Sequence, residues 1–98
     1  MIIAEFSVVP VGTKTPSVSK YVRAALEELG KDKEIRVKPH AMGTLIEARN
    51  LEDLFNAVER AHEVVFKLGV ERVVSEIKID ERRDKEASIE KKINALKV

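Results

Sequence analysis

The chain has 98 residues, of which 44% are hydrophobic and 36% charged, and its formal net charge is +1. This length allows one domain with one core, and the nearly balanced charge argues against a nucleic-acid protein that depends on a basic face. The absence of cysteine excludes disulfides, thiolate zinc sites and cysteine nucleophiles. It also favours a cytoplasmic location, and the many charges of both signs suggest a thermophile.

The first predicted elements are a strand and a helix. Apolar residues alternate from Ile2 to Val9, which is the period of a strand, and we expect Pro10 to Gly12 to end it. The apolar spacing from Val18 to Gly30 predicts a helix, with Gly30 as its stop signal. Thr15 and Ser17 compete as its N-cap. No apolar run approaches the ~20 residues of a membrane span, and the first residues resemble no signal peptide.

Two short strands are expected next. The charged alternation around Ile35 and Val37 predicts an edge strand, and residues 39–43 form a turn or bulge because proline cannot donate to a ladder. Residues 44–48 form a strand with Thr44, Ile46 and Ala48 on one face and Leu45 and Glu47 on the other.

A long helix, a strand and a short helix complete the chain. Asn50 is expected to cap a helix that Gly69 closes. Residues 70–80 alternate as the last strand, and a charged turn follows. Ile89, Ile93 and Leu96 then form a narrow apolar seam of a short helix, typical of a helix that packs on a partner.

This order predicts an α+β fold of the ferredoxin-like βαββαβ type, a two-layer sandwich with an antiparallel four-stranded sheet. We expect one domain over residues 1–98, with a core over 1–84 and an extra C-terminal helix over 85–98. The sheet face that the helices leave uncovered is half apolar and half charged. Such a face indicates self-association into a dimer or tetramer.

Three glutamates on that uncovered face are candidates for chemistry. Glu5, Glu47 and Glu76 could form a carboxylate cluster for acid-base work or a metal. The alternative is cross-strand pairing with Lys78 and Arg72.

The histidines and the first loop offer weaker signals. His62 falls near the apolar stripe of its helix, where a packed histidine is expected, while His40 lies in a turn and either contacts a ligand or is solvated. Their spacing predicts no zinc site. The hydroxyls of residues 13–19, with Lys14, either bind an anion or cap the helix. No nucleophile elbow, Walker loop or dinucleotide turn is present.

Several segments together resemble a known family. They are Val9-Pro10-Val11-Gly12, Ser19-x-Tyr21-Val22, the stretch Pro39-His40-Ala41-Met42-Gly43-Thr44-Leu45-Ile46-Glu47, and the stretch from Gly69 to Asp84. The chain is similar here to the small thiamine-binding proteins, over about residues 1 to 84. One departure is Ala48-Arg49, where a glycine is expected after the glutamate.

The resemblance implies a ferredoxin-like subunit that assembles into dimers and tetramers through its sheets, with a site for thiamine or its hydroxymethylpyrimidine part near subunit contacts. The matching positions are Ser19, Tyr21, Met42, Gly43, Thr44 and Glu47. Glu47 and Thr44 would meet the donors and acceptors of an aminopyrimidine. The cationic thiazolium favours a carboxylate or an aromatic face such as Tyr21 or Phe6, although both aromatics fit a core equally well.

We therefore expect a non-catalytic binder of thiamine or its pyrimidine moiety, acting in salvage, buffering or sensing, without cofactor, metal, nucleic acid or membrane partner. The alternative is a regulatory or scaffolding oligomer that binds another small ligand or an anion. The sequence disfavours two other functions of this architecture, that of an acylphosphatase and that of an RNA-recognition domain. Residues 10–17 lack the arginine-bearing glycine loop of an acylphosphatase, and the central strands lack the aromatics of an RNA-recognition domain.

Overall fold

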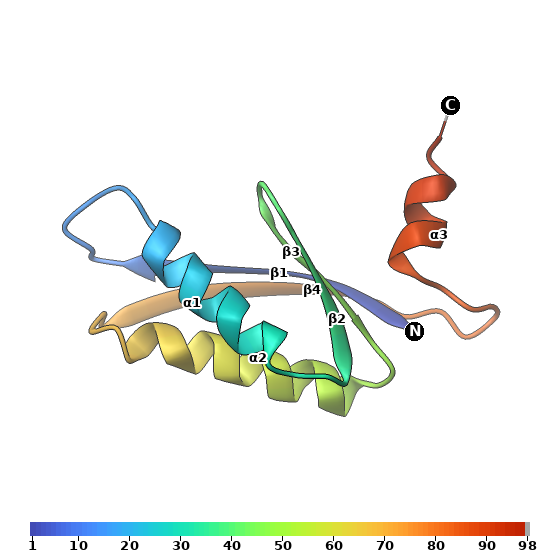
Figure 1. Ribbon diagram of the computed structural model, residues 1–98, viewed down its shortest axis with the longest axis horizontal. Coiled ribbons are helices and arrows are strands. Elements are labelled where there is room, and N and C mark those ends of the chain that lie inside the picture. The colour runs from blue at the N-terminus through green and yellow to red at the C-terminus, as the bar shows by residue number, and fades with distance from the viewer. Residues whose placement is uncertain (98) are drawn as a thin grey trace.

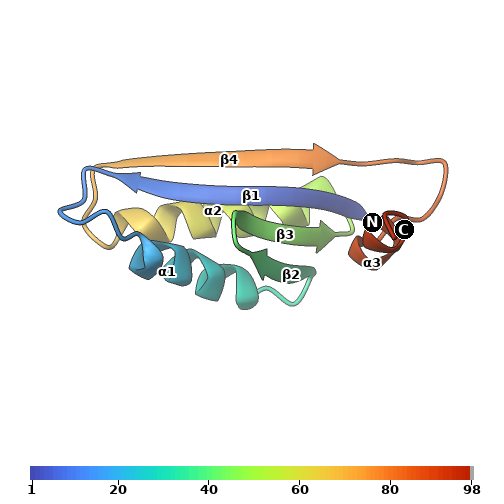
Figure 2. The same ribbon diagram turned by 90° about the horizontal axis from the view of Figure 1, so that it is seen from above.

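A four-stranded antiparallel sheet forms one layer, and two helices cover one of its faces (Figure 1). The computed structural model describes residues 1–97. Its elements are β1 (Ile2–Val11), α1 (Ser19–Gly30), β2 (Ile35–His40), β3 (Gly43–Ala48), α2 (Leu51–Phe66), β4 (Arg72–Asp80) and α3 (Ile89–Asn94). The strands lie in the order β2-β3-β1-β4, which Figure 2 shows from above. The predicted ferredoxin-like sandwich is confirmed.

The core lies between the sheet and the helices α1 and α2. Alternate residues of β1 point into it, because successive side chains of a strand face opposite ways. The helices contribute one apolar stripe each. The buried core residues include Ile2, Ala4, Phe6 and Val8 from β1, Ile46 and Ala48 from β3, Leu29 from α1, and Leu54, Ala57, Ala61 and Val65 from α2. We call the opposite side of the sheet the open face.

The first strand is longer than its sequence suggests. Pro10 lies within β1 and is buried opposite Val73 of β4, so the expectation that Pro10 ends the strand is wrong. β3 pairs with β1 only from Ile2 to Phe6. Beyond that point β1 has one neighbour, and a proline is tolerated where one side of a strand is free.

The hairpin between β2 and β3 is tighter than the expected turn over residues 39–43. Pro39 and His40 belong to β2, and His40 pairs directly with Gly43, so only Ala41 and Met42 form the turn. β2 is an edge strand, which again admits a proline. Gly43 is required by space, because a Cβ there would lie 3.0 Å from the backbone oxygen of Phe6.

The helix ends follow the sequence in part. Asn50 caps α2, with its Oδ1 accepting the Asp53 N–H at 2.8 Å, as predicted. Neither Thr15 nor Ser17 caps α1, since Val18 holds that position without a side-chain hydrogen bond. Thr15 Oγ1 instead accepts the Ser17 N–H at 3.3 Å. This hydrogen bond lies within the loop, before α1 begins.

The C-terminal segment returns to the open face. In Figure 1, α2 lies below β1 and β4, whereas α3 lies at the right end of the sheet and above the level of these two strands. α3 lies near the chain's N-terminus, where the amino group of Met1 pairs with Glu86 at 3.2 Å (Figure 2). Ile89 is buried, while Ile93 and Leu96 of the predicted seam are exposed. Within residues 1–97, no helix is both long and apolar enough to span a membrane.

Candidate functional site

A cavity of about 380 Å³ lies between α1, β1 and the tip of the β2–β3 hairpin. We call it the hairpin cavity. Its lining consists of Phe6 to Val9 from β1, the α1 side residues Val18, Val22, Ala25, Leu26 and Leu29, and the hairpin residues Pro39 to Thr44. Three of the six predicted binding positions, namely Met42, Gly43 and Thr44, therefore meet at this cavity.

The cavity combines apolar walls with a few polar groups. Thr44 pairs with Phe6 across β1 and β3 and is 5% exposed. Thr44 is the buried polar residue of the lining. Ser7 and His40 are the other polar side chains at the cavity. A small, mostly apolar hollow with a few polar groups is typical of a small-molecule site.

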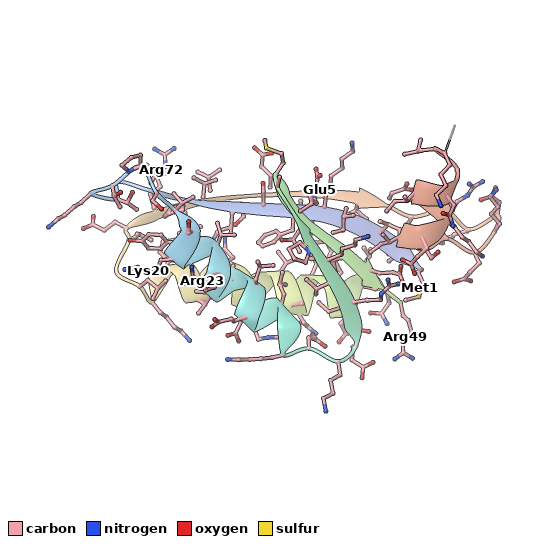
Figure 3. All side chains as sticks on the ribbon, turned by 45° about the horizontal axis from the view of Figure 1, so that its top comes forward. Met1, Glu5, Lys20, Arg23, Arg49 and Arg72 are labelled. Atoms are coloured by element: carbon pink, nitrogen blue, oxygen red, sulfur yellow. The ribbon has the colours of Figure 1, made fainter. Side chains whose placement is uncertain are left out.

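The hairpin tip forms the rim of this cavity. Met42 is 84% exposed, so little packing fixes its position. The backbone N–H of Met42 donates to His40 Nδ1 at 3.2 Å, and His40 Nε2 lies 3.4 Å from Glu5 Oε2. Figure 3 shows Glu5 rising from the side of the sheet away from α1. The rim is thus tied to β1 through one imidazole ring.

Glu47 lies on the other side of the sheet from Thr44. It faces the open face with Arg36 of β2 as its cross-strand partner, and it is 6% exposed. Its Oε2 accepts the backbone N–H of Ile89 at 2.9 Å and lies 3.6 Å from Arg36 Nη1. The carboxylate is therefore occupied by the C-terminal segment and does not reach the hairpin cavity.

Ion pairs hold α3 around this carboxylate. Arg36 donates from Nη1 and Nη2 to the two carboxylate oxygens of Glu90 at 2.7 and 2.8 Å. The hydrogen bonds from Arg36 lower the pKa of Glu90 most, and the positive charge of Arg36 lowers it further. Lys92 donates to Asp80, and that hydrogen bond lowers the pKa of Asp80. These partners are exposed, so each pair contributes less than a buried one would.

The remaining predicted positions, Ser19 and Tyr21, lie apart from the hairpin cavity. Tyr21 is half-buried and borders a depression of about 630 Å³ beside the first loop. The Nζ of Lys20, whose side chain extends from α1 in Figure 3, lies 5.2 Å from the Tyr21 ring centroid. Ser19 is exposed, with its Oγ 3.4 Å from Ser17 Oγ. In one subunit the six positions therefore belong to three separate places.

The two positions that depart from the family pattern also lie away from the cavity. Ala48 is fully buried in the core between the sheet and the helices. Arg49 donates from Nη2 to Glu34 Oε2 at 2.7 Å. Neither residue lines the hairpin cavity.

The glutamates of the open face do not form the pairs that the sequence suggested. Glu5 lies opposite Lys78 in the strand register, but its carboxylate turns to His40. Glu47 pairs with Arg36. Within residues 1–97, no group of three side chains is arranged to hold a metal, and no ion pair joins these glutamates to Lys78 or Arg72. The ion pairs of that alternative are therefore absent among residues 1–97, although Glu5 and Lys78 are cross-strand neighbours.

His62 is the packed histidine that the sequence predicted. Its Nδ1 lies 2.6 Å from the Ser75 hydroxyl, and its ring meets Phe66 edge-on at 5.5 Å. This contact joins α2 to β4 on the helix side of the sheet. It lies outside the lining of the hairpin cavity.

The sequence missed two parts of this arrangement. Val18 and the α1 residues Val22 and Leu26 have the spacing of core positions, yet they form one wall of the cavity. The sequence indicated Arg36 only as a charged residue of an edge strand. The tight turn at Ala41 and Met42 sets Arg36 opposite Glu47, so the correct hairpin register would have found that pair.

Comparison with known proteins agrees with this fold. The profile of a family described as "Thiamine-binding protein" matches residues 4–97. A UPF0045 protein of Methanothermobacter thermautotrophicus is 44% identical over 97 residues, which is 99% of this chain and 97% of the relative. A UPF0045 protein of Bacillus subtilis is 41% identical over 99 residues, with 98% and 92% coverage.

Solved structures show the same architecture. A hypothetical protein of Methanocaldococcus jannaschii superposes with a TM-score of 0.88 at 45% identity, covering 97% of this chain and 94% of that one. A Thermotoga maritima protein, provisionally assigned to thiamine biosynthesis or salvage, superposes with a TM-score of 0.81 at 17% identity, with 98% of both chains covered. The second likeness concerns the fold alone. With a family profile and close relatives that both span nearly its whole length, the chain belongs to the thiamine-binding protein family.

Proposed function

We propose that this protein binds thiamine, or its hydroxymethylpyrimidine moiety, in the hairpin cavity and catalyses no reaction on it. The observation that carries the proposal is the cavity of about 380 Å³ at residues Met42 to Thr44, whose lining is mostly apolar and includes the buried residue Thr44. Pockets of roughly 300–1,000 Å³ suit small ligands. Family membership supports the same ligand class.

The lining suits a methylated pyrimidine better than a sugar or a phosphate. Val22, Leu26 and Phe6 contribute apolar side chains to the lining. The Thr44 hydroxyl can both donate to and accept from the ring nitrogens and the amino group. A cationic thiazolium would remain at the rim, where the ring of His40 contacts the carboxylate of Glu5.

Absence of catalysis is part of the proposal. The polar side chains at the cavity are Ser7, His40 and Thr44. His40 is engaged by the Met42 N–H and by Glu5, so it is not aligned as a base for either hydroxyl. A role in salvage, buffering or sensing needs only reversible binding.

We also propose that subunits associate through the open face. Val9, Val11 and Val74 are more than a third exposed there, at the end of β1 and β4 that lies away from α3. Burying these valines against a second subunit would remove apolar surface from water. Light scattering that gives a monomer mass would contradict this part of the proposal.

The binding proposal is tested by thermal shift and calorimetry with thiamine, hydroxymethylpyrimidine and the thiamine phosphates. We expect thiamine to raise the melting temperature of the wild type. Thr44→Val removes the hydroxyl at nearly constant volume, and we expect it to weaken binding about tenfold, the equivalent of one hydrogen bond to a buried group.

Glu47→Ala is the matched variant on the opposite face. Retained binding in Glu47→Ala with loss in Thr44→Val would support the hairpin cavity. The reverse result would move the site to the open face, where a ligand would have to displace the C-terminal segment. Flat titrations of the wild type with all the compounds would contradict the proposed ligand class.

A further inference from the structure

The ring of His40 connects three parts of the hairpin region. Its Nδ1 accepts the Met42 N–H across the two-residue turn, at 3.2 Å. Because Nδ1 accepts, the proton of the neutral ring lies on Nε2, which faces Glu5 Oε2 at 3.4 Å. The ring therefore joins β2, the turn and β1.

The backbone pairing of His40 with Gly43 joins the tip to the sheet, whereas Met42 packs little and is 84% exposed. Gly43 lets the backbone come close to the same ring, because a Cβ at Gly43 would lie 3.6 Å from His40 Cε1 as well as 3.0 Å from the Phe6 oxygen. The imidazole and the absence of a side chain at residue 43 thus add to the strand pairing that positions the rim.

We propose that His40 is a positioning residue that holds the hairpin tip as the rim of the cavity, and that protonation of its ring releases the tip. The effect on a ligand rests on the proposed function above. The effect on the tip does not, because it needs only the contacts of His40 within the free protein.

Protonation changes what the ring can do. An imidazolium donates from both nitrogens, so Nδ1 no longer accepts the Met42 N–H. Histidine is the side chain that ordinarily changes charge between pH 5 and 8. At neighbouring positions of the strand register, the charged groups on this face are Glu5 from β1, Lys38 from β2 itself, Lys78 from β4, opposite Glu5, and Glu76 from β4, opposite Ser7; Arg36 and Glu47 lie farther along β2 and β3. The Met42 hydrogen bond is lost once the ring is protonated.

The first test is the protection of the Met42 amide against hydrogen exchange, measured by NMR in the ligand-free protein at pH 7.5 and 5.5. We expect protection in the wild type to fall between about twofold and tenfold at the lower pH, the equivalent of one net hydrogen bond. His40→Asn places Oδ1 where Nδ1 stood and does not titrate, so its Met42 amide should stay protected at both values. His40→Ala should leave it unprotected at both. The amide of Ile46 serves as an internal control in each variant.

Two results would overturn the proposal. One is a Met42 amide equally protected at both pH values while the His40 ring titrates. The other is an Asn variant whose Met42 protection falls with pH as in the wild type, because the response would then come from another group.

The second test compares the Kd of thiamine at the two pH values. We expect binding to the wild type to weaken at pH 5.5 by a similar factor and binding to His40→Asn to stay constant. If the Met42 amide responds as expected and thiamine binds at neither pH, the proposed ligand fails and the tip mechanism stands. If thiamine binds the wild type equally well at both values although the tip is released, His40 does not position the site.

Discussion

Glu47 Oε2 accepts the backbone N–H of Ile89 at 2.9 Å, which links the end of β3 to the start of α3 across 42 residues of sequence. Both residues are buried, Ile89 with 1% and Glu47 with 6% of its surface exposed. Thr44, three residues earlier, is on the helix side of the sheet, because side chains alternate along a strand. Within one subunit, the Thr and Glu of the family motif therefore serve two different surfaces.

Loss of the Glu47 carboxylate should release the C-terminal segment. In Glu47→Ala the buried Ile89 N–H loses its acceptor, which costs about 1–3 kcal/mol for an unsatisfied buried group. Glu47→Gln keeps an oxygen that can accept this N–H, so we expect a smaller loss. Urea unfolding measures the stability, and amide exchange at Ile89 measures the local release.

Glu76→Ala is the control for this experiment, because Glu76 is an exposed glutamate of the same face. We expect it to change stability by no more than about 0.5 kcal/mol. An Ala variant at position 47 with wild-type stability and a protected Ile89 amide would show that the carboxylate does not anchor α3.

A methyl group at Gly43 should push β3 away from β1. The added Cβ would lie 3.0 Å from the Phe6 oxygen, which is a backbone atom that cannot turn aside. We expect Gly43→Ala to destabilise the protein by about 1–3 kcal/mol, as overpacking usually does. Thermal or urea unfolding measures this change.

Gly30→Ala is the matched substitution elsewhere. Gly30 is the last residue of α1, has no positive φ, and its Cβ would meet nothing within 4 Å. We expect it to stabilise the protein by up to about 1 kcal/mol, since alanine loses less backbone entropy in a helix. Equal effects of the two substitutions would contradict the steric role of Gly43.

The local parts of the fold were predictable from the sequence because they depend on neighbouring residues. The alternation in residues 44–48 correctly placed Thr44 and Glu47 on opposite faces, and Asn50 was correctly identified as a cap. The end of β1 was predicted wrongly. Pro10 is tolerated only because β3 stops at Phe6, and this is a property of the sheet as a whole.

The parts of the site that depend on distant residues could not be predicted. The Met42-Gly43-Thr44 turn was singled out from its motif, but the α1 wall of the cavity emerges only when the helix packs on the sheet. The seam of Ile89, Ile93 and Leu96 suggested a helix on a partner. Ile89 is buried in this chain, because the segment after β4 turns back and its N–H donates to Glu47, whereas Ile93 and Leu96 are exposed. The partner contact of the seam stays a prediction.

Asn50, before α2, and Ser17, before α1, were both candidate N-caps, and their replacement by alanine should affect stability differently. Asn50→Ala removes the acceptor of the Asp53 N–H and should cost about 0.5–2 kcal/mol. Ser17→Ala should be nearly neutral, because its hydroxyl contacts only Ser19 Oγ at 3.4 Å and caps no helix. Urea midpoints of both variants, measured together, test this difference. A loss in Ser17→Ala as large as that in Asn50→Ala would mean that α1 is capped in solution by its loop.

Acid should detach α3 before it unfolds the rest of the domain. The hydrogen-bonded fork from Arg36, with its charge, holds the pKa of Glu90 below its ordinary value of 4.5. The hydrogen bond from Lys92 holds the pKa of Asp80 below 3.8. A carboxylate whose pKa is lower in the folded protein contributes stability that is fully present above its ordinary pKa. That contribution is lost as the pH falls through the lowered value.

The attachment of α3 should therefore be constant above about pH 5 and weaken below about pH 4.5, the ordinary value for Glu90. Amide exchange of α3 relative to α2, followed by NMR from pH 6 to pH 3, measures it. Glu90→Gln keeps a hydrogen-bonding side chain that does not titrate, so α3 should be looser at pH 6 and lose less on acidification. Added salt should also loosen α3 in the wild type, because salt screens these exposed ion pairs. If Glu90→Gln showed the full pH dependence of the wild type, the Arg36–Glu90 pair would not be a link that holds α3 on the open face.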